Sequence, residues 1–190
     1  MIKIGILGDI GSGKSYVARN FGYPVFNADH EVAELYQKNK DVFKKLKEKL
    51  PKYIYSFPID KLEISNAILA NKNNLNKIIK IVHTEIRKKM NLFLKKNKNS
   101  KIVILDIPLL LENKINKKND ILVYVESKKS TILKKLKKRK NFNQRLLKKF
   151  KAIQYANNYK KKKSHFIIKN NFTKKSVNDG IKNILKKLNK

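Results

Sequence analysis

The chain has 190 residues, of which 41% are hydrophobic, enough to bury the core of about one domain, and this excludes general disorder. It has no cysteine, which excludes disulfide scaffolds and cysteine-ligated metals, and no apolar run approaches the roughly 18 residues of a membrane span. The formal net charge is +33, but 43 of the 47 basic residues are lysine, so an AT-rich codon bias accounts for much of it and no specific nucleic-acid partner is expected.

Short apolar runs bounded by turn residues predict five strands, at residues 2–7, 23–26, 101–107, 121–126 and 165–169. The first run is too short for a signal peptide, and a cytoplasmic location is expected. Helical spacing of apolar residues predicts helices at 14–20, 30–37, 41–50, 60–69, 75–94, 130–139, 144–161 and 176–188. Strands that alternate with helices indicate an α/β fold with a mainly parallel sheet.

One stretch is helical throughout, from about residue 30 to residue 97. It is too long for a single crossover between parallel strands. We therefore predict a single domain whose core comprises residues 1–29 and 100–190, with residues 30–97 as an inserted helical subdomain.

The turn after the first strand carries a phosphate-binding motif. Its sequence, GDIGSGKS, matches G-x-x-x-x-G-K-[ST] between a predicted strand and a predicted helix. Glycines let successive backbone N–H groups point at phosphate oxygens, Lys14 would reach the β- and γ-phosphates, and the Ser15 hydroxyl would bind Mg²⁺. The motif predicts a nucleoside triphosphate site at Gly8, Asp9, Ile10, Gly11, Ser12, Gly13, Lys14 and Ser15.

Four further residues are candidates for chemistry. Asp29 follows the second strand and could accept a proton from an attacking hydroxyl, or it could cap a helix. Asp106 ends the third strand, where aspartate is typical of a Mg²⁺ or water ligand but also of a local turn. Arg139 could bind phosphate oxygens with its planar fork, or lie on the surface. His83 lies on the apolar side of the long helix, where a core histidine is the ordinary interpretation.

Together these blocks resemble the dephospho-coenzyme A kinase family over nearly the whole chain. The most specific block is residues 106–112, DIPLLLE, which is similar to the family's P-L-L-x-E pattern. Arg139 and Gln154 stand at the spacing of the family's helical lid, and residues 166–171 resemble its closing strand and asparagine turn.

The resemblance implies a P-loop kinase fold, with a five-stranded parallel sheet flanked by helices, a helical substrate-binding insert and a helical lid at about 138–162. It implies ATP on residues 11–16, including Tyr16, with adenine near Asn170. It also implies transfer of the γ-phosphate to the ribose 3′-hydroxyl, with Asp29 acting on that hydroxyl and with Lys14, Mg²⁺ and Arg139 holding the developing charge. The residues that would grip dephospho-coenzyme A are Asp29, His83, Pro108, Leu109, Leu110 and Glu112.

Several positions depart from the family pattern. Asp9 stands where glycine is usual and places a carboxylate beside the phosphates, so we expect weaker ATP binding. The others are Tyr16, Thr84, Lys135 and Lys169. Two alternatives stay open: another small-molecule kinase, of which the shikimate type is hardest to exclude, and a basic nucleic-acid-binding ATPase. The oligomeric state is also open, with a monomer as the simplest outcome.

Overall fold

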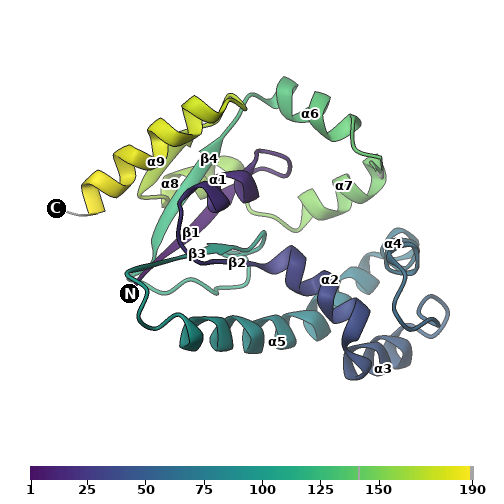
Figure 1. Cartoon of the computed structure of the whole chain (residues 1–190). Coiled ribbons are helices and arrows are strands. Elements are labelled where there is room, and N and C mark those ends of the chain that lie inside the picture. Colours follow the sequence, from purple (N-terminus) through teal and green to yellow (C-terminus); the bar gives the residue numbers. More distant parts are fainter. Residues whose placement is uncertain (141, 189–190) are drawn as a thin grey trace. The chain divides into compact units, whose positions relative to one another are not determined.

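The computed structural model describes residues 1–140 and 142–188, which form two compact units (Figure 1). The sheet unit comprises residues 1–27, 97–142 and 153–190, and the helical unit comprises residues 28–96 and 143–152. The segment predicted as a lid, 138–162, therefore contributes to both units.

A five-stranded parallel sheet forms the centre of the sheet unit, as predicted. In spatial order it runs β2, β3, β1, β4, β5. Every residue of β3 is buried, because helices cover both faces of a parallel sheet and both faces must then be apolar. The strands are β1 (Ile2–Gly8), β2 (Val25–Asn27), β3 (Ile102–Asp106), β4 (Ile121–Glu126) and β5 (Phe166–Lys169).

The described residues of the sheet unit include the helices α1 (Lys14–Asn20), α6 (Lys129–Lys137), α8 (Asn157–Lys163) and α9 (Lys174–Leu188). Helix α9 packs against β5 and α1, and its buried residues Val177, Ile181 and Ile184 recur at helical spacing. They join a core drawn from the sheet and from α1 with the residue that follows it; its other members are Ile4, Ile6, Val17, Ala18, Phe21, Ile102, Ile104, Val123, Val125 and Ile168.

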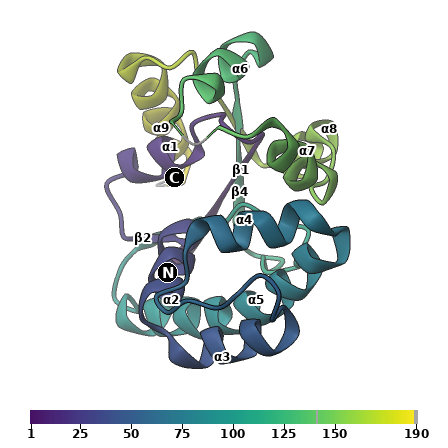
Figure 2. The ribbon, with the colours of Figure 1, turned by 90° about the vertical axis from the view of Figure 1, so that its right-hand side faces the viewer.

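The helical unit is built around the long helix α5 (Figure 2). Helices α2, α3 and α4 pack against α5, and α7 packs against α4. Side chains of Asn39 and Asp60 accept hydrogen bonds from backbone N–H groups and so begin α3 and α4. The helices are α2 (Ala28–Lys38), α3 (Lys40–Lys49), α4 (Lys61–Ala70), α5 (Lys72–Lys96) and α7 (Gln144–Ala152).

The structure differs from the sequence prediction after residue 144. A single helix was expected over 144–161, but α7 ends at Ala152 and α8 begins at Asn157. The interruption has a tertiary cause, because the Tyr155 N–H donates to the Glu112 carboxylate, 2.8 Å away, instead of continuing a helix. A distant side chain thus overrides local helix propensity.

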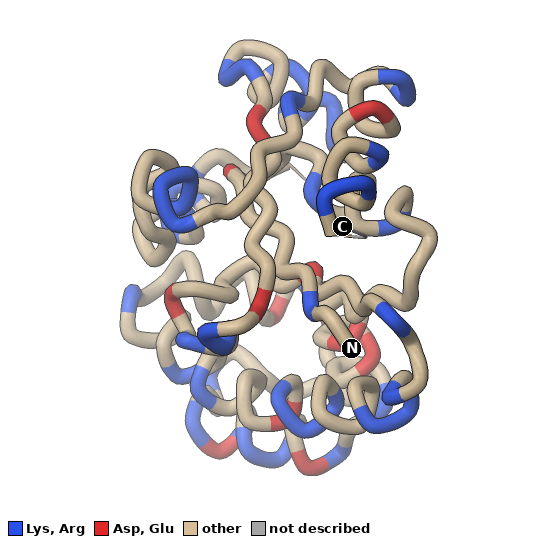
Figure 3. The backbone as a smooth tube through the Cα atoms, turned by 90° about the vertical axis from the view of Figure 1, so that its left-hand side faces the viewer, with Lys and Arg blue, Asp and Glu red and all other residues tan. Residues whose placement is uncertain are grey.

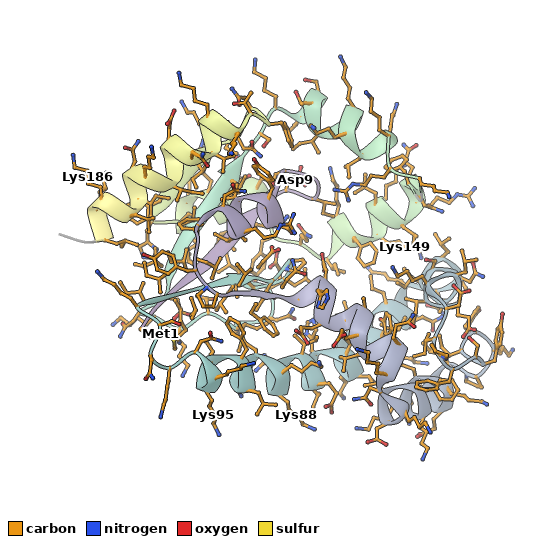
Figure 4. The ribbon with its side chains drawn as sticks, viewed as in Figure 1. Met1, Asp9, Lys88, Lys95, Lys149 and Lys186 are labelled. Atoms are coloured by element: carbon orange, nitrogen blue, oxygen red, sulfur yellow. The ribbon has the colours of Figure 1, made fainter. Side chains whose placement is uncertain are left out.

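Basic residues are distributed along the helices of both units (Figure 3). Lysine side chains such as Lys88 and Lys95 on α5, and Lys186 on α9, project outward from their helices (Figure 4). None of the helices in the described part of the chain combines the length and apolarity needed to cross a membrane.

Candidate active site

The phosphate loop joins β1 to α1, and its glycines have backbone angles that other residues rarely adopt. The φ angles are +84° at Gly11 and +89° at Gly13. A Cβ atom on Gly13 would lie 2.5 Å from the Asn170 Nδ2 atom, and one on Gly11 would lie 2.9 Å from Leu136 Cγ. Both positions therefore require glycine, because of the backbone angle and because a side chain would clash with a neighbour.

Hydrogen bonds to Ser12 fix the middle of the loop. Its carbonyl oxygen accepts from Asn170 Nδ2 at 2.9 Å and from Ser127 Oγ at 3.0 Å. Its N–H donates to the Asp9 carbonyl at 3.1 Å, closing a turn within the loop. Since Ser127 follows β4 and Asn170 follows β5, the carboxyl ends of two other strands hold the loop in shape, at the edge where parallel sheets bind ligands.

The ammonium group of Lys14 bends back over the start of the loop. It donates to the carbonyl oxygens of Asp9, at 2.8 Å, and Gly8, at 3.3 Å. Ser15 follows directly and is half-buried, and the ring of Tyr16 is 40% exposed. The cation and the hydroxyl of the motif therefore come from the first turn of α1.

A carboxylate lies within the loop at Asp9 (Figure 4). Its Oδ1 atom accepts from the Ile10 N–H at 2.7 Å, and the side chain is half-buried. Burial raises the pKa of the Tyr124 hydroxyl, and the negative charge of Asp9 raises this pKa further. The negative charge of Asp9 thus acts on a residue of β4, the strand next to β1.

Asp106 ends β3 with a nearly fully buried carboxylate, 3% exposed. Its Oδ2 atom accepts from Asn27 Nδ2 at 2.7 Å, because β2 and β3 place these two residues in register. No local pattern singles out Asn27 as a partner, since only the strand pairing brings it to Asp106. An oriented carboxylate of this kind is suited to Mg²⁺, which prefers oxygen ligands.

Asn170 and Arg139 come from other elements of the sheet unit. The backbone N–H of Asn170 donates to the Glu126 carbonyl at 2.7 Å, and its side-chain oxygen accepts from the Phe172 N–H at 2.8 Å. Arg139 is exposed and lies just beyond the end of α6. The asparagine is thus a fixed part of the site, while the arginine extends from a helix end.

The loop after β3 divides into buried and half-buried residues. Leu110 is fully buried and packs directly over Gly5 of β1, where there is no side chain to obstruct it. The Glu112 carboxylate accepts from the Tyr155 N–H. Pro108 and Leu109 are half-buried, so both keep surface that a ligand could contact.

Asp29 and His83 belong to the helical unit. Asp29 is exposed in the first turn of α2, and His83 is half-buried on α5. Helices α2 and α5 pack against each other and are joined by an ion pair of 2.7 Å between Lys89 Nζ and Glu31 Oε2. Burial lowers the pKa of His83, and the positive charge of Arg87 lowers it further, so the imidazole favours its neutral form.

Comparison with known proteins identifies relatives over almost the full length of the chain. A dephospho-CoA kinase family model matches residues 2–176. A dephospho-CoA kinase of Wolbachia pipientis is 31% identical, with 98% of this chain and 97% of the relative aligned. One from Zymomonas mobilis is 28% identical, with 90% and 88% aligned.

Solved structures share the fold. A crystal structure from Thermus thermophilus matches with a TM-score of 0.75 at 24% identity, covering 98% of this chain and 97% of that one. The dephospho-CoA kinase from Campylobacter jejuni gives 0.63 at 19%, covering 98% and 96%. A shikimate kinase from Acinetobacter baumannii gives 0.51 at 14%, covering 99% and 93%, and so shows the wider P-loop kinase architecture.

The family model covers the phosphate loop, the strand ends and the helical unit alike, and it decides between the kinases that the sequence left open. The chain belongs to the dephospho-CoA kinase family, whose members use ATP to phosphorylate dephospho-CoA in the last step of coenzyme A biosynthesis.

Proposed function

We propose that this chain transfers the γ-phosphoryl group of ATP to the 3′-hydroxyl of the ribose of dephospho-CoA. The observation that carries the proposal is the glycine-rich phosphate loop of a chain of this family. Asn170 donates a hydrogen bond to this loop, and the Lys14 ammonium group lies over its start. Backbone N–H groups at the start of α1 favour anionic oxygens, and the ammonium of Lys14 can exchange its two carbonyl acceptors for phosphate oxygens.

Ser15 and Asp106 are the residues that would hold Mg²⁺, Ser15 through its hydroxyl and Asp106 directly or through water. Among the described residues no group of three or more histidine or acidic side chains is assembled for a metal. An ion held by one or two protein oxygens and by phosphate oxygens fits this donor set. When bound, Mg²⁺ shields the charge of the phosphates. Asn27 orients the Asp106 carboxylate for this role.

Asp29 is proposed as the group that accepts the proton of the attacking hydroxyl. As the hydroxyl oxygen bonds to the γ-phosphorus, the bond from that phosphorus to the bridging oxygen of ADP breaks, and the hydroxyl proton moves to the Asp29 carboxylate. Lys14 and Arg139 would balance the negative charge on the transferring group. Neutral His83 and the half-buried Pro108 and Leu109 are proposed contacts of dephospho-CoA, with adenine of ATP near Asn170.

The test combines a product assay with one variant. The wild-type chain is incubated with ATP, Mg²⁺ and dephospho-CoA, and phosphorus NMR locates the added phosphate, with shikimate and AMP as alternative acceptors. We expect phosphate on the 3′-hydroxyl of dephospho-CoA and on neither alternative. Transfer to the other acceptors alone would contradict the proposal.

The variant Asp29→Asn should lower kcat by about two to four orders of magnitude and leave ATP affinity unchanged. Asp41→Asn serves as the control, because Asp41 is also exposed in the first turn of a helix of the same unit. A parallel loss of ATP affinity in Asp29→Asn would instead assign Asp29 to the nucleotide site.

A further inference from the structure

One lysine of the sheet unit is buried. Lys160, on α8, is 2% exposed, and it is the only lysine found in the interior among the residues that the structure describes. Its neighbour Lys162 is exposed, as most lysines of this chain are. An ammonium group removed from water is costly unless charged and polar partners replace the water. The groups that replace water around the Lys160 ammonium therefore indicate its role.

The partners form a closed polar cluster. Lys160 Nζ donates to Gln154 Oε1 at 2.7 Å and lies 3.5 Å from Glu112 Oε1. The Glu112 side chain is itself 9% exposed, and the same Oε1 atom accepts from the Tyr155 N–H at 2.8 Å. The Oε1 atom of Glu112 thus contacts both Lys160 and the Tyr155 N–H.

The cluster joins two segments that are distant in the sequence. Glu112 lies in the loop after β3, whose other anchor is Leu110, buried over Gly5. Gln154 and Tyr155 follow the point at residues 152–153 where the chain returns from the helical unit to the sheet unit. Next to these anchors the loop carries Pro108 and Leu109, the half-buried residues proposed above to contact dephospho-CoA.

We propose that Lys160 is a positioning residue for dephospho-CoA. Through Glu112 it fixes the loop after β3, so that Pro108 and Leu109 present one surface to this substrate; this role rests on the proposed function. A directional ion pair is suited to the task, because a buried pair adds little net stability compared with apolar residues but allows few alternative arrangements. The phosphate loop is held instead by Ser127 and Asn170, so the affinity for ATP should be independent of Lys160.

The test compares Michaelis constants for the two substrates. Lys160→Met keeps an unbranched side chain, shorter by one atom, and removes the charge. We expect the KM for dephospho-CoA to rise about tenfold or more and the KM for ATP to change by less than about twofold, as expected when a positioning group is lost. Lys160→Arg should restore most of the affinity for dephospho-CoA, because it returns the positive charge to Glu112.

Lys161→Met is the matched control on the same helix. Lys161 pairs with Glu126 at 2.6 Å, but the two side chains are 42% and 36% exposed, so the loss of this pair should change neither Michaelis constant. The double variant Lys160→Met with Glu112→Gln removes both buried charges and keeps an acceptor for the Tyr155 N–H. It should fold even where the single variant does not, and it should still bind dephospho-CoA weakly.

An unchanged KM for dephospho-CoA in the folded double variant, or an equal loss of affinity for both substrates, would overturn the positioning role. A wild-type chain that does not phosphorylate dephospho-CoA would overturn the proposed function before any variant is made. Equilibrium binding of dephospho-CoA by calorimetry separates these cases, because positioning affects binding in the absence of turnover.

Discussion

The Asn170 side-chain amide donates to the backbone carbonyl of Ser12 over 2.9 Å and ties the loop after β5 to the phosphate loop. The same side chain accepts from the Phe172 N–H on its other side, so both ends of the amide are used. Asn170 is buried, and water cannot replace it as a partner. The shape of the nucleotide site at one end of the chain therefore depends on a residue near the other end.

Replacement of Asn170 by alanine should weaken ATP binding. The Ser12 carbonyl loses one of its two donors and keeps the other, Ser127 Oγ, and the loss of one hydrogen bond costs about 1 kcal/mol. If that cost falls on the bound form of the loop, the Kd for ATP rises roughly fivefold. Calorimetric titration with ATP measures the change. Asn171→Ala is the control, since Asn171 is exposed and only caps the following turn. Equal affinities for the two variants would contradict the assignment.

Gly13→Ala and Gly22→Ala separate steric conflict from backbone strain. Both glycines have positive φ, +89° and +74°, but a Cβ on Gly13 would collide with the Asn170 amide, whereas one on Gly22 would meet nothing within 4 Å. We expect Gly22→Ala to cost about 1 kcal/mol of unfolding free energy with ATP affinity unchanged. Gly13→Ala should abolish detectable ATP binding and lose more stability than Gly22→Ala, because the collision adds to the backbone strain. Denaturant titration and ATP calorimetry on both variants provide the comparison.

Removal of the Asp9 charge should strengthen ATP binding. Asp9→Asn keeps an oxygen that can accept from the Ile10 N–H and deletes a negative charge beside the site of the phosphates. At a distance of several ångströms in a partly screened site the repulsion is on the order of 1 kcal/mol, so the Kd for ATP should fall about fivefold. The gain should shrink as salt is added. Asp179→Asn, at a position on α9, changes the net charge equally and should have no comparable effect.

The lowered pKa of His83 gives the stability a dependence on pH. Its pKa lies below the ordinary value of 6.5 because of burial and then because of Arg87. Below pH 6.5 the imidazole is protonated in the unfolded chain but still neutral in the folded protein, so the free energy of unfolding falls as the pH falls. This contribution levels off below the folded-state pKa. Above pH 6.5 the contribution no longer changes with pH.

His83→Gln removes this titration and leaves the other groups in place. Urea denaturation at about pH 7.5 and about pH 5.5 should show a smaller loss of stability for the variant than for the wild type. In Arg87→Met the pKa of His83, followed by NMR, should move part of the way back toward 6.5. A wild-type imidazole that titrates at or above 6.5 would show that neither burial nor Arg87 acts on it.

The features that sequence predicted best are local and contiguous. The phosphate loop is one unbroken motif, and the strands are short apolar runs, so the five strands were found with their ends shifted by two residues at most. Sequence patterns did not predict the order of the strands, because that order depends on pairing between distant segments. Helix α5 begins at Lys72 rather than at residue 75. The Asn71 side chain accepts a hydrogen bond from the Asn73 N–H and so allows a first turn made of polar residues.

Features that depend on partners from elsewhere in the chain were not predictable. In the run Leu109, Leu110, Leu111 nothing local selects the one that packs inward; Gly5 does so by leaving room on β1. The interruption between α7 and α8 requires the Glu112 carboxylate, and the orientation of Asp106 requires Asn27 across a strand pair. The burial of Lys160 was not predictable either, because this residue stands in a run of lysines and the sequence does not distinguish it from its neighbours.

The position of β1 in the middle of the sheet has a consequence for how the protein is made. Ile2 lies opposite Ile102, and Gly8 lies opposite Val125, so β1 has no strand partner until residues 102–125 have also been synthesised. The intervening helices α2 to α5 contact one another and can fold as they emerge. The phosphate loop is therefore synthesised well before the strands and the asparagine that hold it in shape, and the apolar strand β1 stays unpaired in the meantime.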